Sequence, residues 1–179
     1  MDPTRALVVF YSRTGTTDIV ARAIRDELGC EIEAIRDAKH RVGVVGYLRS
    51  GFDAAFRRPA KLLAMSSDPN DYDLVIVGTP IWNASVSAPV RTYLLANRER
   101  IRRVAFFCTH GGSGSARVLH QMEEICGQPP IVTMVLRTEE VRHSGFAAKV
   151  RSFVSALKRT TTSAEAGGHP PVVHVPTLA

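Results

Sequence analysis

The chain has 179 residues, 45% of them hydrophobic, so its length and composition predict a single domain with a sizeable core. No apolar run reaches the roughly 18 residues of a membrane-spanning helix, and residues 1–5 contain no leader-like stretch, so we expect neither a membrane span nor a signal peptide. The net charge is +6 without a nucleic-acid-binding motif, and three scattered cysteines predict reduced thiols in a cytoplasmic protein.

The first predicted strand leads directly into a turn rich in hydroxyl groups. Leu7 to Tyr11 is a continuous apolar run, which is typical of a buried strand, and a helical pattern follows from about Thr17 to Leu28. The connecting residues are Ser12, Arg13, Thr14, Gly15, Thr16 and Thr17. Because the first N–H groups of a helix lack partners and the helix dipole favours negative charge there, this turn predicts an anion site.

The turn lacks the residues of two common phosphate motifs. A Walker loop ends in Gly-Lys-Ser/Thr, and a dinucleotide fingerprint needs three spaced glycines, whereas this turn has no lysine and only Gly15. Four hydroxyl groups without an obligatory cation suit a terminal phosphate monoester that is held by hydrogen bonds. An ordinary turn capped by Thr16 or Thr17 is the alternative that the residues leave open.

Ser12, Thr14, Gly15 and Thr17 fit the pattern Ser/Thr-x-Thr-Gly-x-Thr without a gap, and the turn thereby resembles the phosphate loop of the flavodoxin family. That family binds flavin mononucleotide (FMN). The resemblance therefore implies FMN as the cofactor and assigns its ribityl phosphate to this loop.

The next segment combines a short strand with a long basic connection. Cys30 to Ile35 alternates as a second strand, and the connection from Arg36 to Asp73 contains an amphipathic helical pattern over residues 45–56. Arginines and lysines outnumber acidic residues between positions 36 and 61. This basic surface would guide an acidic partner or an anionic substrate, or it is a solvated face without such a role.

Three further strands and three helices alternate in the rest of the chain. The strands are expected at Leu74–Val77, Val104–Cys108 and Ile131–Leu136, and the helices at Pro89–Asn97, Ser115–Ile125 and Phe146–Leu157. This alternation predicts an α/β fold, a doubly wound five-stranded parallel sheet, and the resemblance implies the flavodoxin-like strand order 2-1-3-4-5. We expect a domain over residues 1–158 and a disordered tail over 159–179.

Two more loops are expected at the same sheet edge as the phosphate loop. The segment after the third strand contains Thr79, Pro80, Ile81, Trp82 and Asn83, and Trp82 is the only tryptophan of the chain. The resemblance implies that Trp82 contacts the isoalloxazine ring while its neighbours line the ring edge. The alternative is a tryptophan that anchors the loop on the next helix.

The loop after the fourth strand contains Thr109, His110, Gly111 and Gly112, whose backbone N–H groups would reach the edge of a planar ligand. His110 is either a proton donor near the flavin or a locally hydrogen-bonded residue. No nucleophile elbow and no Cys-x5-Arg phosphatase motif occurs here, and we predict no catalytic side chain and no metal ligand.

The favoured interpretation is a flavodoxin-like FMN-binding redox protein that acts in electron transfer, with a partner protein or a small acceptor. The alternative is an FMN-dependent NAD(P)H oxidoreductase acting on a quinone or similar acceptor. The loop after the fourth strand lacks the tyrosine and acidic residues of many carrier flavodoxins, which favours the alternative. A non-redox module that keeps the fold without flavin is the third interpretation.

Overall fold

A computed structural model describes residues 5–38, 60–165 and 173–175 of the chain. Its centre is a twisted sheet with the strand order β2-β1-β3-β5-β6-β7. The parallel strands are β1 (Ala6–Phe10), β2 (Glu31–Ala34), β3 (Leu74–Trp82), β5 (Val104–His110), β6 (Val132–Arg137) and β7 (Val173–Val175). A two-residue strand, β4 (Ser85–Val86), pairs antiparallel with the end of β3. The predicted order 2-1-3-4-5 is confirmed, because it corresponds to β2-β1-β3-β5-β6.

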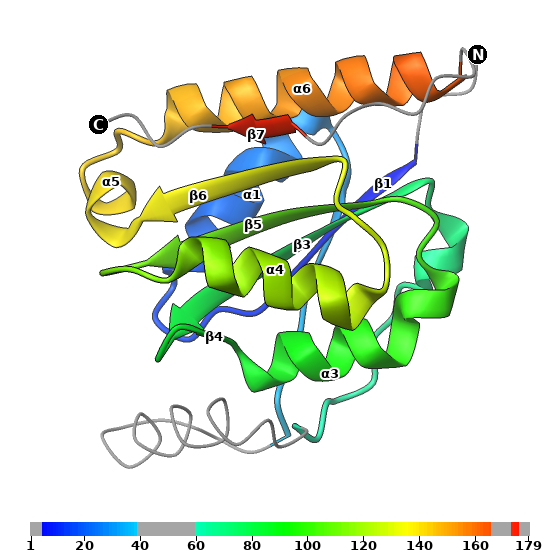
Figure 1. Cartoon of the computed structure of the whole chain (residues 1–179), viewed down its shortest axis with the longest axis horizontal. Coiled ribbons are helices and arrows are strands. Elements are labelled where there is room, and N and C mark those ends of the chain that lie inside the picture. The colour runs from blue at the N-terminus through cyan, green and yellow to red at the C-terminus, as the bar shows by residue number, and fades with distance from the viewer. Residues whose placement is uncertain (1–4, 39–59, 166–172, 176–179) are drawn as a thin grey trace.

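Helices cover both faces of the sheet (Figure 1). The helices are α1 (Thr16–Leu28), α3 (Ala88–Asn97), α4 (Ser115–Cys126), α5 (Thr138–Arg142) and α6 (Ala147–Glu165), with short 3-10 turns at Pro69–Asp71 and Arg98–Arg100. Helices α1 and α6 pack on one face, and α3 and α4 pack on the other. This is the flavodoxin-like arrangement expected of parallel crossover units.

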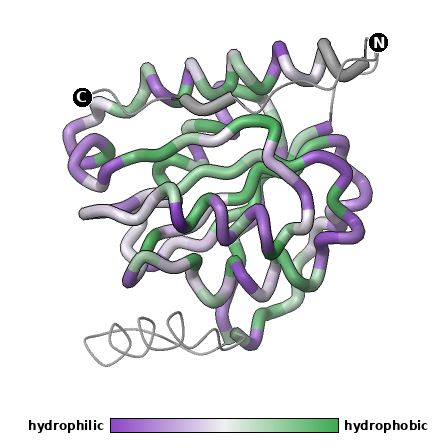
Figure 2. The backbone as a smooth tube through the Cα atoms, in the orientation of Figure 1, coloured by the Kyte–Doolittle hydropathy of each residue, from purple (hydrophilic) through white to green (hydrophobic). Residues whose placement is uncertain are grey.

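The alternation of side chains along each strand divides the core into two layers. In β1, Val8 and Phe10 face α1 and α6, whereas Leu7 and Val9 face α3 and α4. Strands β1, β5 and the first part of β3 are buried on both faces, which explains their continuous apolar sequence. Figure 2 shows the same pattern as a hydrophobic centre beneath helices of mixed hydropathy.

Strand β3 is longer than predicted. We expected a loop from Gly78, but Thr79 and Pro80 continue the ladder by pairing with Cys108 and Thr109 of β5. The chain then reverses at Asn83, because Trp82 pairs with Ser85 in a tight hairpin. Strand β5 likewise continues through Thr109 to His110, two residues beyond the predicted end. Both differences arise because neighbouring strands extend each other's pairing, which a single segment's sequence does not reveal.

The predicted disordered tail over residues 159–179 is wrong for two segments. Helix α6 continues to Glu165, and its buried Thr160 and Thr161 donate hydrogen bonds to carbonyl groups one turn earlier. Strand β7 adds a parallel edge strand beside Val132–Met134 of β6. The remaining tail residues, and the amphipathic pattern over residues 45–56, lie outside the described residues.

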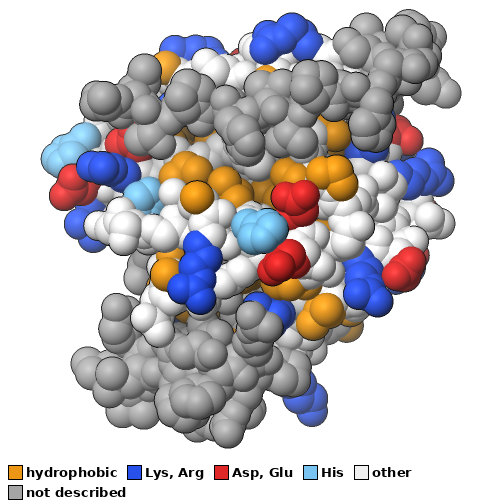
Figure 3. Space-filling model, viewed as in Figure 1, with side chains coloured by type: hydrophobic (Ala, Val, Ile, Leu, Met, Phe, Trp, Pro, Cys, Tyr) orange, Lys and Arg blue, Asp and Glu red, His pale blue; other side chains and the backbone are white. Residues whose placement is uncertain are grey.

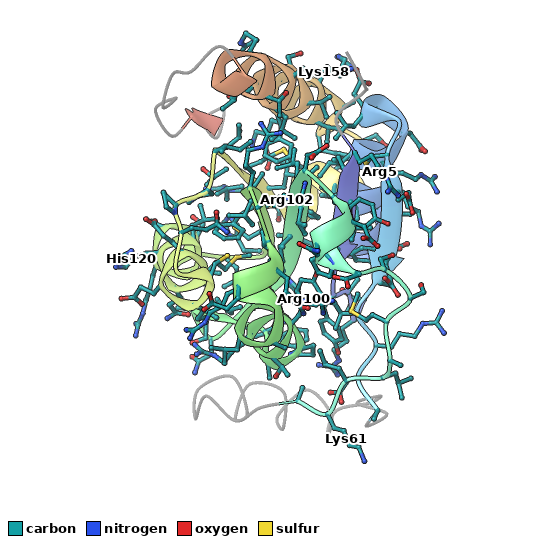
Figure 4. All side chains as sticks on the ribbon, turned by 90° about the vertical axis from the view of Figure 1, so that its right-hand side faces the viewer. Arg5, Lys61, Arg100, Arg102, His120 and Lys158 are labelled. Carbon is teal, nitrogen blue, oxygen red and sulfur yellow. The ribbon has the colours of Figure 1, made fainter. Side chains whose placement is uncertain are left out.

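Charged pairs gather at the amino-terminal edge of the sheet, which faces the viewer in Figure 4. Arg5 contacts Glu31 at 3.3 Å, Arg102 contacts Asp73 at 3.4 Å, and Arg100 pairs with Asp68. The labelled arginines therefore have acidic neighbours, and exposed pairs of this kind contribute little stability. Most of the basic segment over residues 36–61 lies outside the described residues.

A hollow of about 340 Å³ lies between α4 and β6, and it is lined by Leu119, Pro130, Thr133 and Val135 among others. Hydrophobic side chains are visible on the face shown in Figure 3, interspersed with acidic groups and histidines. Within the described ranges, no helix is both long and apolar enough to cross a membrane.

A buried ion pair joins α5 to α6. Lys149 is only 3% exposed, and its Nζ lies 2.5 Å from Oε1 of Glu140. Oε2 of Glu140 accepts a hydrogen bond from the Arg137 amide at 2.6 Å. Burial opposes the charged carboxylate, but these hydrogen bonds and the positive charges of Lys149 and Arg137 outweigh it. The pKa of Glu140 is therefore lowered from its ordinary value.

We predict that Glu140→Gln destabilises the protein by about 3 kcal/mol at pH 7, because it leaves the Lys149 ammonium buried without its counter-charge. A carboxylate whose pKa is lower in the folded state contributes stability above its unfolded pKa, and this contribution is lost as pH falls through the folded value. Urea unfolding across a pH series measures the difference in unfolding free energy between the wild type and Glu140→Gln. It should shrink below about pH 4, and a difference that is constant from pH 7 to 3 would contradict the assignment. Exposed Glu139→Gln is the matched control.

A second prediction concerns Gly78, which pairs with Phe107 across the sheet. A Cβ on Gly78 would lie 2.1 Å from Cζ of the fully buried Phe107 ring. Gly78→Ala should therefore destabilise the protein by about 1–3 kcal/mol through overpacking. Gly145→Ala is the control, since a Cβ there meets only a carbonyl oxygen at 3.7 Å. Equal unfolding midpoints for the two variants would refute the close approach.

Candidate functional site

The carboxyl-terminal ends of β1, β3 and β5 lie side by side at one edge of the sheet (Figure 1). Phe10, the last residue of β1, pairs with Gly78, and Gly78 pairs with Phe107, whereas β3 and β5 continue past this level to Trp82 and His110. The three predicted site segments follow these positions directly: residues 12–17, 79–83 and 109–112. The parallel topology therefore brings them to one place.

The first segment ends in a helix whose N-cap has no side chain. Gly15 is the N-cap of α1, with a φ of 89°, and no side chain caps the helix. The alternative of a turn capped by Thr16 or Thr17 is therefore wrong. Glycine permits this left-handed conformation at low cost. The first N–H groups of α1 consequently remain available to an anion.

Ser12 carries a buried hydroxyl group without a partner. Its Oγ is inaccessible to solvent and has no hydrogen-bond partner among the described residues. An unsatisfied buried polar atom costs about 1–3 kcal/mol, and such atoms are concentrated at functional sites. Thr14 beside it is exposed and Thr16 is half-buried, so their side chains remain accessible from solvent. This part of the loop is suited to a ligand that accepts hydrogen bonds.

Thr17 differs from the other hydroxyl residues of the loop. It is 1% exposed, and its Oγ1 lies 2.8 Å from Oγ1 of Thr109, which is 3% exposed. The first and third segments are thus joined by a buried hydrogen bond. Spacing alone could not reveal this contact, because 92 residues separate the two threonines.

Trp82 is half-buried and contacts the first segment. Its ring meets Tyr11 edge-on, with ring centroids 5.7 Å apart and planes at 90°. The guanidinium carbon of Arg13 lies 5.9 Å from the Trp82 ring centroid. Trp82 also packs partly against the core cluster beneath α3 and α4. The sequence predicts Tyr11 only as the end of the first strand, whereas the structure places its ring against Trp82.

The hairpin that carries Trp82 is held from both sides. Ser87 and Thr79 share buried hydrogen bonds, and the Val86 amide donates to Oε1 of Gln121 on α4 at 3.2 Å. The turn residues Asn83 and Ala84 have positive φ angles of 48° and 50°. Asparagine tolerates this conformation, whereas alanine is strained in it. The anchors on both sides therefore hold a strained turn in place.

The third segment is partly strand and partly exposed loop. Thr109 and His110 complete β5, and Gly111 and Gly112 follow it on the surface. His110 is 8% exposed, and its Nδ1 is buried without a partner among the described residues. Thr109 faces α1, so the strand alternation directs His110 to the face of α3 and α4.

The chemistry of the site does not include a thiolate. Burial raises the pKa of Cys108 to about 12, and it raises those of Cys30 and Cys126 to about 11. These thiols remain protonated near pH 7 and are poor nucleophiles. Among the described residues, no group of three or more His, Cys, Asp or Glu side chains could hold a metal ion. The arrangement suits a bound anion and a flat heterocycle.

Comparisons with known proteins found a matching family and similar folds. Residues 6–146 match the model of a family described as NADPH-dependent FMN reductase. Among solved structures, the chain is similar to a flavoprotein in complex with FMN from Lactobacillus acidophilus NCFM (TM-score 0.65, 24% identity, covering 78% of this chain and 97% of that chain).

Two flavoproteins described as putative have a similar fold. One is from Bacteroides eggerthii DSM 20697 (TM-score 0.65, 20% identity, covering 78% of this chain and 94% of that chain). The other is from Bacteroides uniformis ATCC 8492 (TM-score 0.65, 20% identity, covering 79% and 97%). No protein among curated sequences matches this chain.

The contacts of Trp82 generate a prediction that uses FMN as the probe. Because Trp82 is the only tryptophan, stacking of the flavin on its ring should strongly quench both tryptophan and flavin fluorescence. Trp82→Ala should restore flavin fluorescence and lower the affinity for FMN about tenfold, whereas Trp82→Phe should retain most of the affinity. Fluorescence titration measures both effects. An unchanged FMN affinity in Trp82→Ala would show that the Trp82 side chain only packs against the protein.

Proposed function

Because the chain belongs to the NADPH-dependent FMN reductase family, we propose that it binds FMN at the carboxyl edge of the sheet and passes electrons from NADPH to a small acceptor. The family match spans the phosphate loop, the Trp82 hairpin and the third segment. The observation that carries the proposal is the buried, unpartnered Ser12 hydroxyl beside the bare N-cap of α1. A terminal phosphate supplies the acceptor oxygens that this loop lacks.

The described residues can be assigned to the phosphate, the ring face and the ring edge of FMN. The hydroxyls of Ser12, Thr14, Thr16 and Thr17 and the first-turn N–H groups of α1 would hold the phosphate. Trp82 would contact the isoalloxazine ring, with Thr79, Pro80, Ile81 and Asn83 along the hairpin beside it. Thr109, His110, Gly111 and Gly112 would border the ring edge, Thr109 through its backbone. FMN, when bound, supplies the hydride and electron chemistry, and the protein supplies binding and orientation.

A reductase is favoured over a pure electron carrier. The sequence interpretation favoured the carrier, but the family match supports the NAD(P)H oxidoreductase alternative better. The exposed Gly111 and Gly112 agree with it, because the third segment places no bulky side chain over the site at these positions. The overall reaction balances when NADPH and a proton reduce the acceptor by two electrons and NADP⁺ leaves.

The partners follow from this chemistry. We propose a nicotinamide dinucleotide as the electron donor and a quinone or similar small molecule as the acceptor. A redox partner protein remains the alternative acceptor. The cytoplasm supplies the reduced nicotinamide, and the unpaired cysteines Cys30, Cys108 and Cys126 are consistent with a reducing compartment.

Anaerobic spectroscopy of the FMN-loaded protein tests the function. If the protein is a reductase, the visible absorbance of its flavin should bleach when NADPH is added and return when a quinone follows. A yellow protein that NADPH fails to bleach, but that accepts electrons from a reductase protein, would establish the carrier instead. A protein that stays colourless after incubation with FMN would refute both.

The phosphate loop is tested separately by Thr14→Val. Thr14 is exposed and precedes the N-cap of α1, so the stability of the apoprotein should change little. Loss of a charge-assisted hydrogen bond worth about 1.5–3 kcal/mol should lower the affinity for FMN by about tenfold or more. Riboflavin lacks the phosphate, and its affinity should be nearly unchanged. Equal losses for both flavins in calorimetric titrations would show that Thr14 does not contact the phosphate.

A further inference from the structure

The buried Thr17–Thr109 pair has two hydroxyl donors but only one hydrogen bond between them. Each hydroxyl group has one O–H donor, and the two oxygens share a single contact of 2.8 Å. The structure describes no other side-chain hydrogen bond for either threonine. One hydroxyl therefore donates to the other, and the second O–H is left without an acceptor in a buried setting, where such a group costs about 1–3 kcal/mol.

The positions of the two threonines indicate which of the two hydroxyl protons is left without an acceptor. Thr17 lies in the first turn of α1, two residues after the N-cap Gly15, where the unpaired N–H groups of the helix converge. Thr109 lies inside β5, between Cys108 and His110, and its backbone pairs with Pro80 and Leu136 of the adjacent strands. Thr17 therefore lies beside the open end of the helix, whereas strands β3 and β6 flank Thr109.

We propose that Thr109 is a positioning residue for the anion site: its hydroxyl donates to Thr17 Oγ1, so that the Thr17 O–H points at the bound phosphate. The inference rests on the proposed function, because the anion is the phosphate of FMN. In this arrangement the hydroxyl of Thr109 contributes to phosphate binding, while its backbone borders the flavin ring edge. A chain of hydrogen bonds also strengthens its members, so Thr109 makes Thr17 a better donor.

The experiment is a double-mutant cycle on FMN binding. Thr109→Val keeps the shape of the side chain and removes the donor, and it should weaken FMN about fivefold, as expected for one net hydrogen bond. Thr17→Val removes the donor to the phosphate itself and should weaken FMN about tenfold or more. In the Thr17→Val background, Thr109→Val should have almost no further effect, because the proton that it positions is gone.

Riboflavin separates positioning from packing. Its affinity should change less than about twofold in every variant, since a ligand without phosphate does not use the Thr17 proton. Thr109→Ser keeps the hydroxyl and should restore FMN affinity close to that of the wild type. Thr160→Val is the matched control: it removes another buried threonine hydroxyl, on α6, and should leave the binding of both flavins unchanged.

The outcomes distinguish this inference from the proposed function. Independent, additive losses from Thr17→Val and Thr109→Val overturn the inference alone, as does an unchanged FMN affinity in a folded Thr109→Val protein. A wild-type chain that binds FMN and riboflavin equally overturns the phosphate assignment and the inference together. If Thr109→Val does not fold, Thr109→Ala replaces it in the cycle with the same expected non-additivity.

Discussion

The parallel hydrogen bonding of β1, β3 and β5 is the constraint on which the site depends. These strands are buried on both faces along most of their length, so their registers are fixed by packing from two layers of helices. Parallel pairing sends all three chains to the same edge, and the strand registers set how far each one runs before it leaves the sheet. A one-residue slip of β3 would carry Trp82 to the opposite face and separate it from Tyr11.

Local features that lower stability gather at this edge. The Ser12 hydroxyl and the His110 Nδ1 are buried without partners among the described residues, and Ala84 adopts a φ of 50°. Each feature costs about 1–3 kcal/mol, and the surrounding strands and α4 supply the packing that sustains them. Such exceptions to local rules are expected where a protein leaves groups open for a ligand. The positions of Ser12, His110 and Ala84 at this edge are independent of the family match.

Hydrophobic periodicity and strand–helix alternation predict the strands, the helices and the α/β class, whereas the sheet order and the three site segments follow from the resemblance to flavodoxins. The sequence does not predict the extension of β3 to Trp82, because pairing with Cys108 and Thr109 depends on a strand that follows much later in the chain. The Thr17–Thr109 bond has the same origin: it forms only once β1, β3 and β5 are in register. Strand β7 was missed since it gains its hydrogen bonds from β6 rather than from its own periodicity.

The distribution of charge bears on which partner the site receives. At the amino-terminal edge, Arg5, Arg100 and Arg102 each have an acidic neighbour, so the positive charge there is locally balanced. At the carboxyl edge, Arg13 lies beside Trp82 and the helix dipole of α1 adds further positive potential. FMN and NADPH are both polyanions, and a site with this potential attracts them, whereas the acidic surround of many carrier flavodoxins repels a dinucleotide. The electrostatics of the described part of the site therefore suit an anionic ligand.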